Sequence, residues 1–440
     1  MTAIPFASAV GSQRIIFDGL NLSLAQGTGI ATYTRMLTRV ARDLGHEIGI
    51  VYSSSRAPSK NPVLREINFF DEARSRRKSV PEKIGEKLGY VVDQIRCHGA
   101  VRPQPVELSG VVITREYSAN LPEGGQVFAA RNLFNNGRLY FSRTNAFVNL
   151  AFDDRPDIFH CTYPLPLRVK SACNIYTIHD LVPLRLPFTT LDNKRQMFNL
   201  LKKIAAEADH IVTVSENSKR DIVELLGIEE SRVTNTYQSV EFPEECIERH
   251  DNAIADQLGR SFGLGLREYL LFYGALEPKK NILRLIEAYQ SSGVDVPLVI
   301  VVSGGWHNRA ETRLLTKFRE NSHIRRLDYV SFTTLGVLIR GAQAVVFPSL
   351  YEGFGLPVLE AMVLGTPVVA SRESSVPEVA GEAALLVDPY DTDQIARAIT
   401  TIVSDADLRT ELARRGPLQA AKFSVERYRE RVAEVYAALR

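Results

Sequence analysis

From Tyr269 onward, short apolar segments alternate with segments of helical periodicity. The apolar segments lack the polar alternation of a half-exposed strand; they read LLFYGAL, VPLVIVVSG, YVSF, AVVFPS, PVVAS and ALLVDP. The segments with helical spacing between them read NILRLIEAY, ETRLLTKF, TLGVLIRGA and GLPVLEAM. Uniformly apolar strands separated by helices are typical of a parallel sheet covered on both faces. This part of the chain is therefore predicted to form a doubly wound α/β domain.

The chain before Tyr269 repeats this organisation less regularly. Its predicted strands read RIIFDG, EIGIVYS, DIFHCT, NIYTIHD and HIVTV, and ATYTRMLTRVARDLG is a predicted helix. Ser215 is predicted to cap a helix that contains Ile222 and Leu226. Because 440 residues exceed the size at which a single core stops growing, two domains are expected.

The pattern weakens into Pro, Glu, Asp and Gly over about 241–267, which predicts an interdomain linker. We therefore predict one Rossmann-like domain over residues 1–250, a second over 251–423, and a final helix over 424–440. Ligands of open α/β sheets bind at the carboxyl ends of the strands. A cleft between two facing domains is the expected place for a site.

The composition is that of an ordinary globular protein, and its formal net charge of +2 argues against a general nucleic-acid binder. The four cysteines are widely spaced and form no CxxC pair, unlike those of a zinc site or a disulfide framework. No segment approaches the ~20 apolar residues of a membrane span, and the N-terminus lacks a signal-peptide pattern. We expect a cytoplasmic protein, with any contact with the inner face of the cytoplasmic membrane being peripheral.

The segment YEGFGLPVLEAM, residues 351–362, places two carboxylates across a glycine-rich turn. Glu352 falls in the loop after a predicted buried strand, and Glu360 falls in the second turn of the following helix. Gly353 and Gly355 leave backbone N–H groups open to an anion or to sugar hydroxyls at the positive end of the helix dipole. Since ionised carboxylates accept from paired hydroxyls, the layout predicts a sugar-nucleotide site. The alternative is that both glutamates are simply solvated.

The segment GALEPKKNILRL, residues 274–285, ends a predicted strand and opens a predicted helix. Lys279 and Lys280 would lie beside the cleft at the positive end of the helix dipole. Two ammonium groups there suit a diphosphate, and a solvated helix start is the alternative.

The segment AQGTGIATYTRML places Gly27 and Gly29 just before a predicted helix, where bare N–H groups could contact a phosphate or admit an acceptor. It nearly spells the dinucleotide fingerprint GxGxxG. However, Thr32 occupies the third glycine position, and a long loop separates the turn from the strand that ends at Phe17. These departures count against a nicotinamide-binding protein.

His179 ends the predicted strand NIYTIHD, where a side chain leaves the sheet and enters the cleft. A lone histidine is more often structural than catalytic, so both roles are open. Asp180 could orient the imidazole ring or cap the next segment.

Two further segments resemble binding sites. Asp391-Thr392-Asp393 has the form of a DxD metal motif, but it starts a predicted helix and is interpreted as a cap, so no metal site is predicted. A basic run over 74–78 is followed by helical spacing of apolar residues up to Ile95. That stretch is compatible with an anionic membrane surface, an acceptor groove or an ordinary packed helix.

The block from Ala344 through Pro389 resembles the C-terminal signature of the retaining glycosyltransferases of family 4. The resemblance is clear over 269–388 and patchy over 27–226. It implies the GT-B fold, in which two Rossmann-like domains face each other across a cleft and the last helix packs on the first domain. It also implies transfer of a sugar from a nucleotide diphosphate donor with retention of anomeric configuration, without a cofactor or metal ion.

The resemblance assigns roles to the candidate residues. Glu352 and His179 match residues beside the donor sugar and are predicted to be catalytic. Glu360 matches the residue that binds the donor ribose, and Lys280 matches the lysine of the phosphate-binding turn. The other predicted donor-binding residues are Gly29, Lys279, Val330, Gly353, Phe354, Gly355 and Leu356, with Val330 contacting the base through its backbone.

One position departs from the family. Ala275 stands where many members carry an arginine, and Lys279 would supply the missing cation.

GALEPKKN and SSVPEVAGEAALLVDP look most like bacterial mannosyltransferases of surface polysaccharide synthesis. GDP-mannose is therefore the first choice of donor, with UDP-sugars as the alternative, and the acceptor would be a glycan or a lipid-linked glycan. Two other functions stay open: a sugar-nucleotide epimerase of the same fold and a non-catalytic nucleotide-sugar-binding protein.

Overall fold

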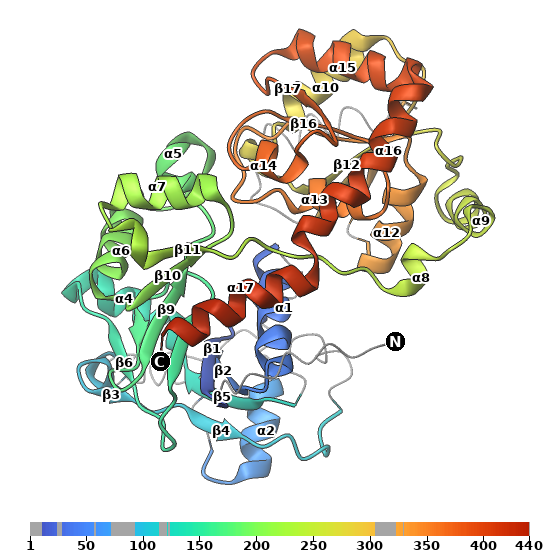
Figure 1. Ribbon diagram of the computed structural model, residues 1–440. Coiled ribbons are helices and arrows are strands. Elements are labelled where there is room, and N and C mark those ends of the chain that lie inside the picture. Colours follow the sequence, from blue (N-terminus) through green and yellow to red (C-terminus); the bar gives the residue numbers. More distant parts are fainter. Residues whose placement is uncertain are drawn as a thin grey trace, which may run out of the picture.

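The computed structural model describes residues 11–23, 29–56, 59–71, 93–113, 121, 124–303, 323–328 and 330–439. These residues form two α/β domains, and the chain crosses between them twice (Figure 1). The first crossing follows the last strand of the first domain, and the second leads into the C-terminal helix. The predicted fold class is confirmed.

The first domain is built on a sheet with strand order β11-β10-β9-β7-β1-β2-β5-β4, parallel except for the antiparallel pair β4 and β5. A small parallel sheet of order β3-β6-β8 lies beside it. The strands are β1 (Arg14–Asp18), β2 (Glu47–Ser54), β3 (Ala100–Val101), β4 (Gln104–Val106), β5 (Gln126–Arg131), β6 (Val148–Leu150), β7 (Ile158–Cys161), β8 (Leu167–Arg168), β9 (Cys173–Thr177), β10 (His210–Thr213) and β11 (Val233–Asn235).

Successive residues of β1 belong to different cores, because side chains alternate across a strand. Ile15 and Phe17 pack with α1, whereas Ile16 packs into the cluster on the opposite face. The helices of this domain are α1 (Gly29–Asp43), α2 (Pro62–Phe70), α4 (Leu133–Thr144), α5 (Val182–Arg185), η2 (Pro187–Thr189), α6 (Lys194–Glu207), α7 (Glu216–Leu226) and η3 (Glu230–Arg232). Ser215 caps α7 as predicted, since its side chain accepts from the N–H of Ser218 at 3.0 Å.

The second domain has a six-stranded parallel sheet of order β14-β13-β12-β15-β16-β17. All four residues of β15 are fully buried, in keeping with a sheet covered on both faces. The strands are β12 (Leu270–Ala275), β13 (Leu298–Ser303), β14 (Ile324–Leu327), β15 (Ala344–Phe347), β16 (Val368–Ser371) and β17 (Leu385–Val387). The helices are α9 (Asp251–Phe262), η4 (Pro278–Lys280), α10 (Ile282–Ser292), α12 (Phe332–Gly341), α13 (Leu356–Val363), α14 (Val376–Ala380), α15 (Thr392–Ser404), α16 (Ala406–Ala420) and η6 (Ala421–Phe423).

Two local predictions were wrong. The segment 241–267, predicted as an interdomain linker, contains α8 (Glu244–Ile247) and α9, and Ile254 and Leu258 of α9 are buried within the second domain. YVSF was predicted as a strand; its Tyr329 lies outside the described residues, Val330 is in no strand, and Ser331 caps α12 by accepting from the N–H of Thr334. A serine N-cap explains the second error, because its hydroxyl satisfies an orphan N–H and favours a helix start.

The C-terminal helix α17 (Val425–Ala438) returns from the second domain to the first (Figure 1). The hydroxyl of its Tyr436 lies 2.9 Å from Nδ1 of the buried His160 in β7, and the ring of Tyr428 meets that of Tyr33 in α1. These contacts attach the end of the described chain to the first domain.

Candidate active site

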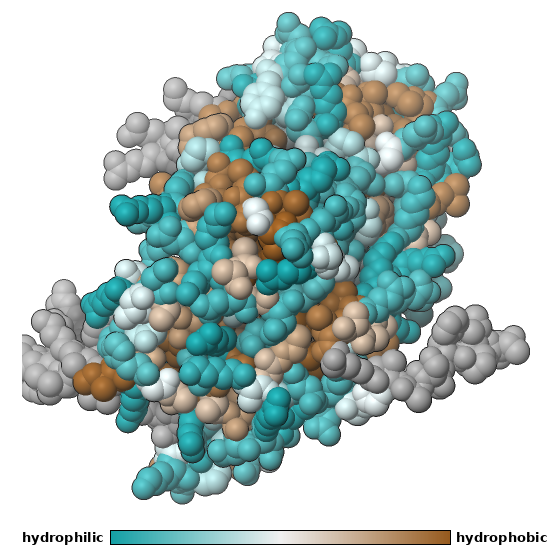
Figure 2. Space-filling model, turned by 60° about the vertical axis from the view of Figure 1, so that its left-hand side comes forward, coloured by the Kyte–Doolittle hydropathy of each residue, from teal (hydrophilic) through white to brown (hydrophobic). Residues whose placement is uncertain are grey.

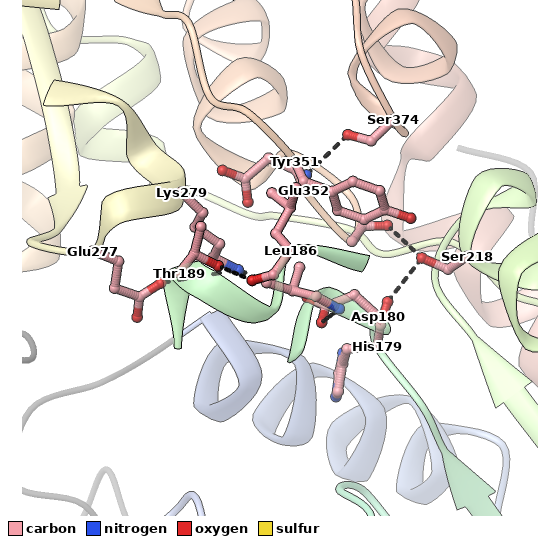
Figure 3. A network of polar contacts seen from close by, with 12 residues as sticks. His179, Asp180, Leu186, Thr189, Ser218, Glu277, Lys279, Tyr351, Glu352 and Ser374 are labelled. Atoms are coloured by element: carbon pink, nitrogen blue, oxygen red, sulfur yellow. Dashed lines mark hydrogen bonds and ion pairs between the residues drawn. The ribbon is translucent and has the colours of Figure 1, made fainter. Parts of the chain in front are cut away.

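The loops that follow β9, β12 and β15 meet between the two domains. The loop after β9 carries His179 and Asp180, the loop after β12 carries Lys279 and Lys280, and the loop after β15 carries Glu352. Figure 3 shows the Glu352 loop next to the loop of His179 and Asp180, with Lys279 reaching between them. The carboxyl ends of both sheets therefore border one interdomain region, where open α/β sheets bind ligands.

The two glycines of the Glu352 loop are each required for a different structural reason. Gly355 caps α13 with φ +104°, a backbone conformation that favours glycine. A Cβ on Gly353 would lie 2.6 Å from the carbonyl oxygen of His179 and 3.1 Å from Cβ of Asp180. Only a residue without a side chain allows this approach of the two domains.

The two lysines form ion pairs with different carboxylates. Nζ of Lys280 lies 2.8 Å from Oε1 of Glu352, and both side chains are nearly buried. The same ammonium lies 5.0 Å from the centre of the Phe347 ring, a cation–π contact. Nζ of Lys279 lies 3.7 Å from Asp180 of the first domain. Burial lowers the pKa of Lys279, but the carboxylates around it outweigh burial and the net shift of its pKa is upward.

Glu360 is a buried carboxyl group in the first turns of α13, with 8% of its surface exposed. Burial raises its pKa to about 7, opposed by a hydrogen bond from Tyr273 and by the charge of Lys280. The group therefore changes charge near neutral pH. A carboxylate there would gain from any ligand that brings hydroxyl donors.

The imidazole of His179 is held in one tautomer. Its Nε2–H donates to the carbonyl oxygen of Thr162 at 2.9 Å, and the ring of Tyr33 meets it edge-on at 4.7 Å between centroids. Burial lowers the pKa of His179, with the Thr162 carbonyl and Asp180 acting in the opposite direction. A neutral ring with its proton on Nε2 leaves Nδ1 with a lone pair. The carboxylate of Asp180 accepts from the N–H of Val182, the first residue of α5, and also faces Nζ of Lys279.

A buried carboxyl group behind His179 was missed by the sequence analysis. Asp18, at the carboxyl end of β1, accepts hydrogen bonds from the N–H and the hydroxyl of Thr162. Burial raises its pKa to about 6, while the Thr162 hydrogen bonds lower it. Asp18 thus fixes the residue whose carbonyl holds His179. Its sequence signal is an aspartate directly at the end of a predicted strand.

The remaining predicted donor-binding residues lie on separate elements of the two domains. Gly29 is the first residue of α1, and a Cβ there would lie 3.4 Å from the side chain of Leu356 across the domain boundary. The Phe354 ring is buried against Tyr237 and Phe423, so only its backbone is available to a ligand. Val330 follows β14 at the edge of the second sheet.

Two further sequence predictions concern segments outside this region. Asp391 caps α15 by accepting from the N–H of Gln394 at 2.8 Å, in agreement with the interpretation of the DxD sequence. The basic run 74–78 lies outside the described residues, and Ile95, at the end of the predicted apolar spacing, is 65% exposed.

Within the part of the chain that the structure describes, no three His, Cys, Asp or Glu side chains gather as metal ligands. Among the described helices, none has the length and apolar character needed to cross a membrane.

Comparison with known proteins places the chain in a family. A family model described as "Glycosyl transferases group 1" matches residues 263–419, and one described as "Glycosyltransferase Family 4" matches residues 110–240. O-antigen chain mannosyltransferase B of Escherichia coli is 33% identical over 301 residues, which are 66% of this chain and 76% of that protein. The serotype-specific mannosyltransferase WbdA of Escherichia coli is 28% identical over 322 residues, which are 67% of this chain but 38% of that protein.

A solved structure shows the same two-domain architecture. Sucrose-phosphate synthase from Thermosynechococcus elongatus superposes with a TM-score of 0.65 and 16% identity, over 97% of this chain and 99% of that one. This likeness concerns the fold, and the family follows from the sequence relatives. The chain is therefore a glycosyltransferase of family 4, with the two-domain GT-B fold.

Proposed function

We propose that the protein transfers mannose from GDP-mannose, with retention of anomeric configuration, to a glycan or lipid-linked glycan of a bacterial surface polysaccharide. The observation that carries the proposal is the convergence of Glu352, Lys280, Lys279 and the His179 loop between the two domains. The choice of mannose is supported by the relatives named O-antigen mannosyltransferases. UDP-sugars are the competing donors.

The ion pairs of the lysines suggest how a donor would bind. The diphosphate of a nucleotide sugar carries negative charge and would take over Lys280 from Glu352 and Lys279 from Asp180. Glu352 would then be free to accept from the hydroxyls of the donor sugar. Glu360, in the helix α13 that follows the Glu352 loop, would accept hydrogen bonds from the ribose diol when its carboxyl group is ionised.

In the transfer step, the bond between the anomeric carbon and the β-phosphate oxygen breaks, and its electron pair goes to the diphosphate. Lys279 and Lys280 stabilise the growing negative charge, and Glu352 stabilises the positive character of the sugar. The acceptor hydroxyl attacks the anomeric carbon from the face that the phosphate leaves. Its proton passes to the leaving phosphate oxygen, which serves as the base.

His179 would lie beside the donor sugar as a neutral imidazole. The fixed tautomer presents an acceptor at Nδ1 to a sugar hydroxyl, which orients the sugar without adding charge. Asp180 would hold Lys279 in place until the diphosphate arrives.

The test is a screen of nucleotide sugars for thermal stabilisation, slow hydrolysis and transfer to polysaccharide fragments, because a ligand that binds only the folded state stabilises it more, the tighter it binds at a given concentration. GDP-mannose is expected to give the largest response, and proton NMR of the product should show the anomeric configuration of the donor. An inverted product would contradict the retaining step. Conversion of the donor sugar without acceptor would indicate an epimerase, and binding without hydrolysis or transfer would indicate a binding protein.

The proposed function also includes a peripheral contact with an anionic membrane surface, which rests on the basic run 74–78. Co-sedimentation of the full chain with vesicles rich in anionic lipid is expected, and it should weaken when salt is raised. Binding that does not depend on anionic lipid would contradict an electrostatic contact.

A further inference from the structure

The first turn of α7 makes polar contacts with the second domain. The carboxylate of Glu378, in α14 of the second domain, accepts from the N–H groups of Glu216 at 3.0 Å and Asn217 at 3.1 Å. These are N–H groups of the first helical turn, which have no partner within the helix. A carboxylate from one domain therefore satisfies the helix start of the other, with favourable charge at the positive end of its dipole.

Tyr351, the residue before Glu352, makes a second contact with α7. Its hydroxyl donates to the carboxylate of Asp221 and accepts from Nδ2 of Asn217 at 2.7 Å. Asp221 is buried and is held from the other side by Arg185, with Nε 2.7 Å from its Oδ1. The Tyr351 hydroxyl thus meets a preoriented charged acceptor, the stronger kind of hydrogen bond.

Ser218 of α7 links the two candidate catalytic loops directly. Its fully buried hydroxyl lies 3.0 Å from the carbonyl oxygen of His179 and 3.2 Å from that of Gly353 (Figure 3). One hydroxyl proton is shared between a loop of the first domain and the loop that carries Glu352.

The Glu352 loop is also fixed from the side of its own domain. The N–H of Glu352 donates to the hydroxyl of Ser374 at 2.9 Å, and its carbonyl accepts from that of Ser375 at 2.9 Å. The backbone at Glu352 is therefore fixed within the second domain, while the residues on either side of it, Tyr351 and Gly353, reach the first. The position of this carboxylate relative to His179 depends on the interdomain contacts.

We infer that these contacts form a docking seam that holds the domains closed and sets Glu352 against the His179 loop. We call it the α7 seam and define it as Asn217, Ser218 and Asp221 of the first domain with Tyr351, Gly353 and Glu378 of the second. Its members are positioning residues, and their catalytic effect rests on the proposed function of the site. The seam makes a complete active site a property of the closed arrangement alone.

The seam is tested first by Tyr351→Phe, which removes one hydroxyl and keeps the ring, and by Asp221→Asn. A hydrogen bond to a charged group contributes about 1.5–3 kcal/mol, so each variant should shift the closed-to-open ratio by roughly 10-fold or more. Small-angle X-ray scattering of the full chain without ligand should then show a larger radius of gyration. Tyr390→Phe, at a half-exposed tyrosine of the second domain, is the matched control and should scatter like wild type.

Kinetics provide the second measurement. With donor and acceptor saturating, Tyr351→Phe should lower kcat about 10-fold, while the affinity for nucleotide on the second domain changes less than about 3-fold. A Tyr351→Phe protein that scatters like wild type overturns the inference, whatever its kcat. If the wild-type protein shows no transfer with any nucleotide sugar, the proposed function fails, and the scattering comparison alone decides the seam.

Discussion

Nζ of Lys280 lies 2.8 Å from Oε1 of Glu352, and the side chains are 12% and 7% exposed. A nearly buried ion pair is costly to break on one side, because the remaining charge is left without a partner. In the proposed reaction a diphosphate replaces the carboxylate as the partner of the ammonium.

Lys280→Ala is therefore expected to weaken donor binding about 10- to 100-fold and to lower kcat as well, because the ammonium interacts with the diphosphate before and during bond cleavage. Titration with donor and single-turnover rates measure the two effects. Lys170→Ala, at an exposed lysine of the first domain, is the matched control. Donor affinity at the wild-type level in Lys280→Ala would refute the phosphate assignment.

Glu352→Gln keeps the shape of the side chain and removes its charge. We expect transfer to fall by roughly 10²–10³-fold, because the oxocarbenium-like sugar loses its counter-charge, while nucleotide affinity changes little. Glu229→Gln, at an exposed position before η3, should behave like wild type. A transfer rate within a few-fold of wild type would remove Glu352 from the catalytic residues.

The affinity for a nucleotide sugar should rise with pH through neutrality. The pKa of Glu360 is raised to about 7 by burial, so the carboxylate that accepts from ribose forms only as the pH passes that value. If the ionised form alone binds, the affinity should rise roughly 10-fold between pH 6 and pH 8. Calorimetry across this range measures it, and Glu360→Gln should give a flat profile. A slope that persists in Glu360→Gln must come from another group.

The stability of the fold should fall below pH 6.5 through His160. Burial lowers its pKa from 6.5 to about 3, so the unfolded chain binds a proton in this window that the folded one does not. The contribution of neutral His160 to the free energy of unfolding is therefore fully present above pH 6.5 and is lost as the pH falls toward 3. Between pH 7 and pH 5 the loss is about 2 kcal/mol.

Urea unfolding of wild type and His160→Gln at both pH values isolates this contribution. The variant loses stability at pH 7, because the hydrogen bonds to Tyr436 and Thr177 change, but its pH slope should be shallower. His250→Gln, at an exposed histidine, is expected to keep the wild-type slope. Parallel slopes for wild type and His160→Gln would exclude His160 as the source.

Gly353→Ala should separate the domains without unfolding either one. The new Cβ would lie 2.6 Å from the backbone oxygen of His179, which cannot rotate away as a side chain would. We expect kcat to fall 10-fold or more with a small change in melting temperature. Gly259→Ala in α9, where a Cβ meets nothing within 4 Å, should leave activity unchanged and stabilise the helix slightly. Equal activity of both variants would show that the contact at Gly353 is dispensable.

Much of the architecture could be predicted because strands of a parallel sheet are uniformly apolar. The apolar run AVVF predicts a buried strand without any knowledge of the strands that pair with it. The helices α8 and α9 were missed because Pro, Glu, Asp and Gly suggest a linker when the apolar contacts of Ile254 and Leu258 are unknown. Weak local preference was overridden there by packing against α12.

The candidate site could be predicted where its residues all lie within one short segment of the sequence. Glu352, Glu360 and the glycines lie within one strand, turn and helix. Asp18, Ser218 and Asp221 could not be found this way, because each acquires its role from a partner more than 100 residues away or in the other domain. Ser218 and Asp221 lie on α7 in sequence surroundings typical of any helix, and the only local signal for Asp18 is its place at the end of β1.

The return of α17 to the first domain has a mechanical consequence. The second domain is joined to the first at two places, by the segment after β11 and by the segment between η6 and α17. A domain that is connected to its neighbour by two segments has fewer ways to move relative to it than a domain on a single linker. The two connections, together with the contacts of α17 on the first domain, therefore limit how far the second domain can move away from the His179 loop.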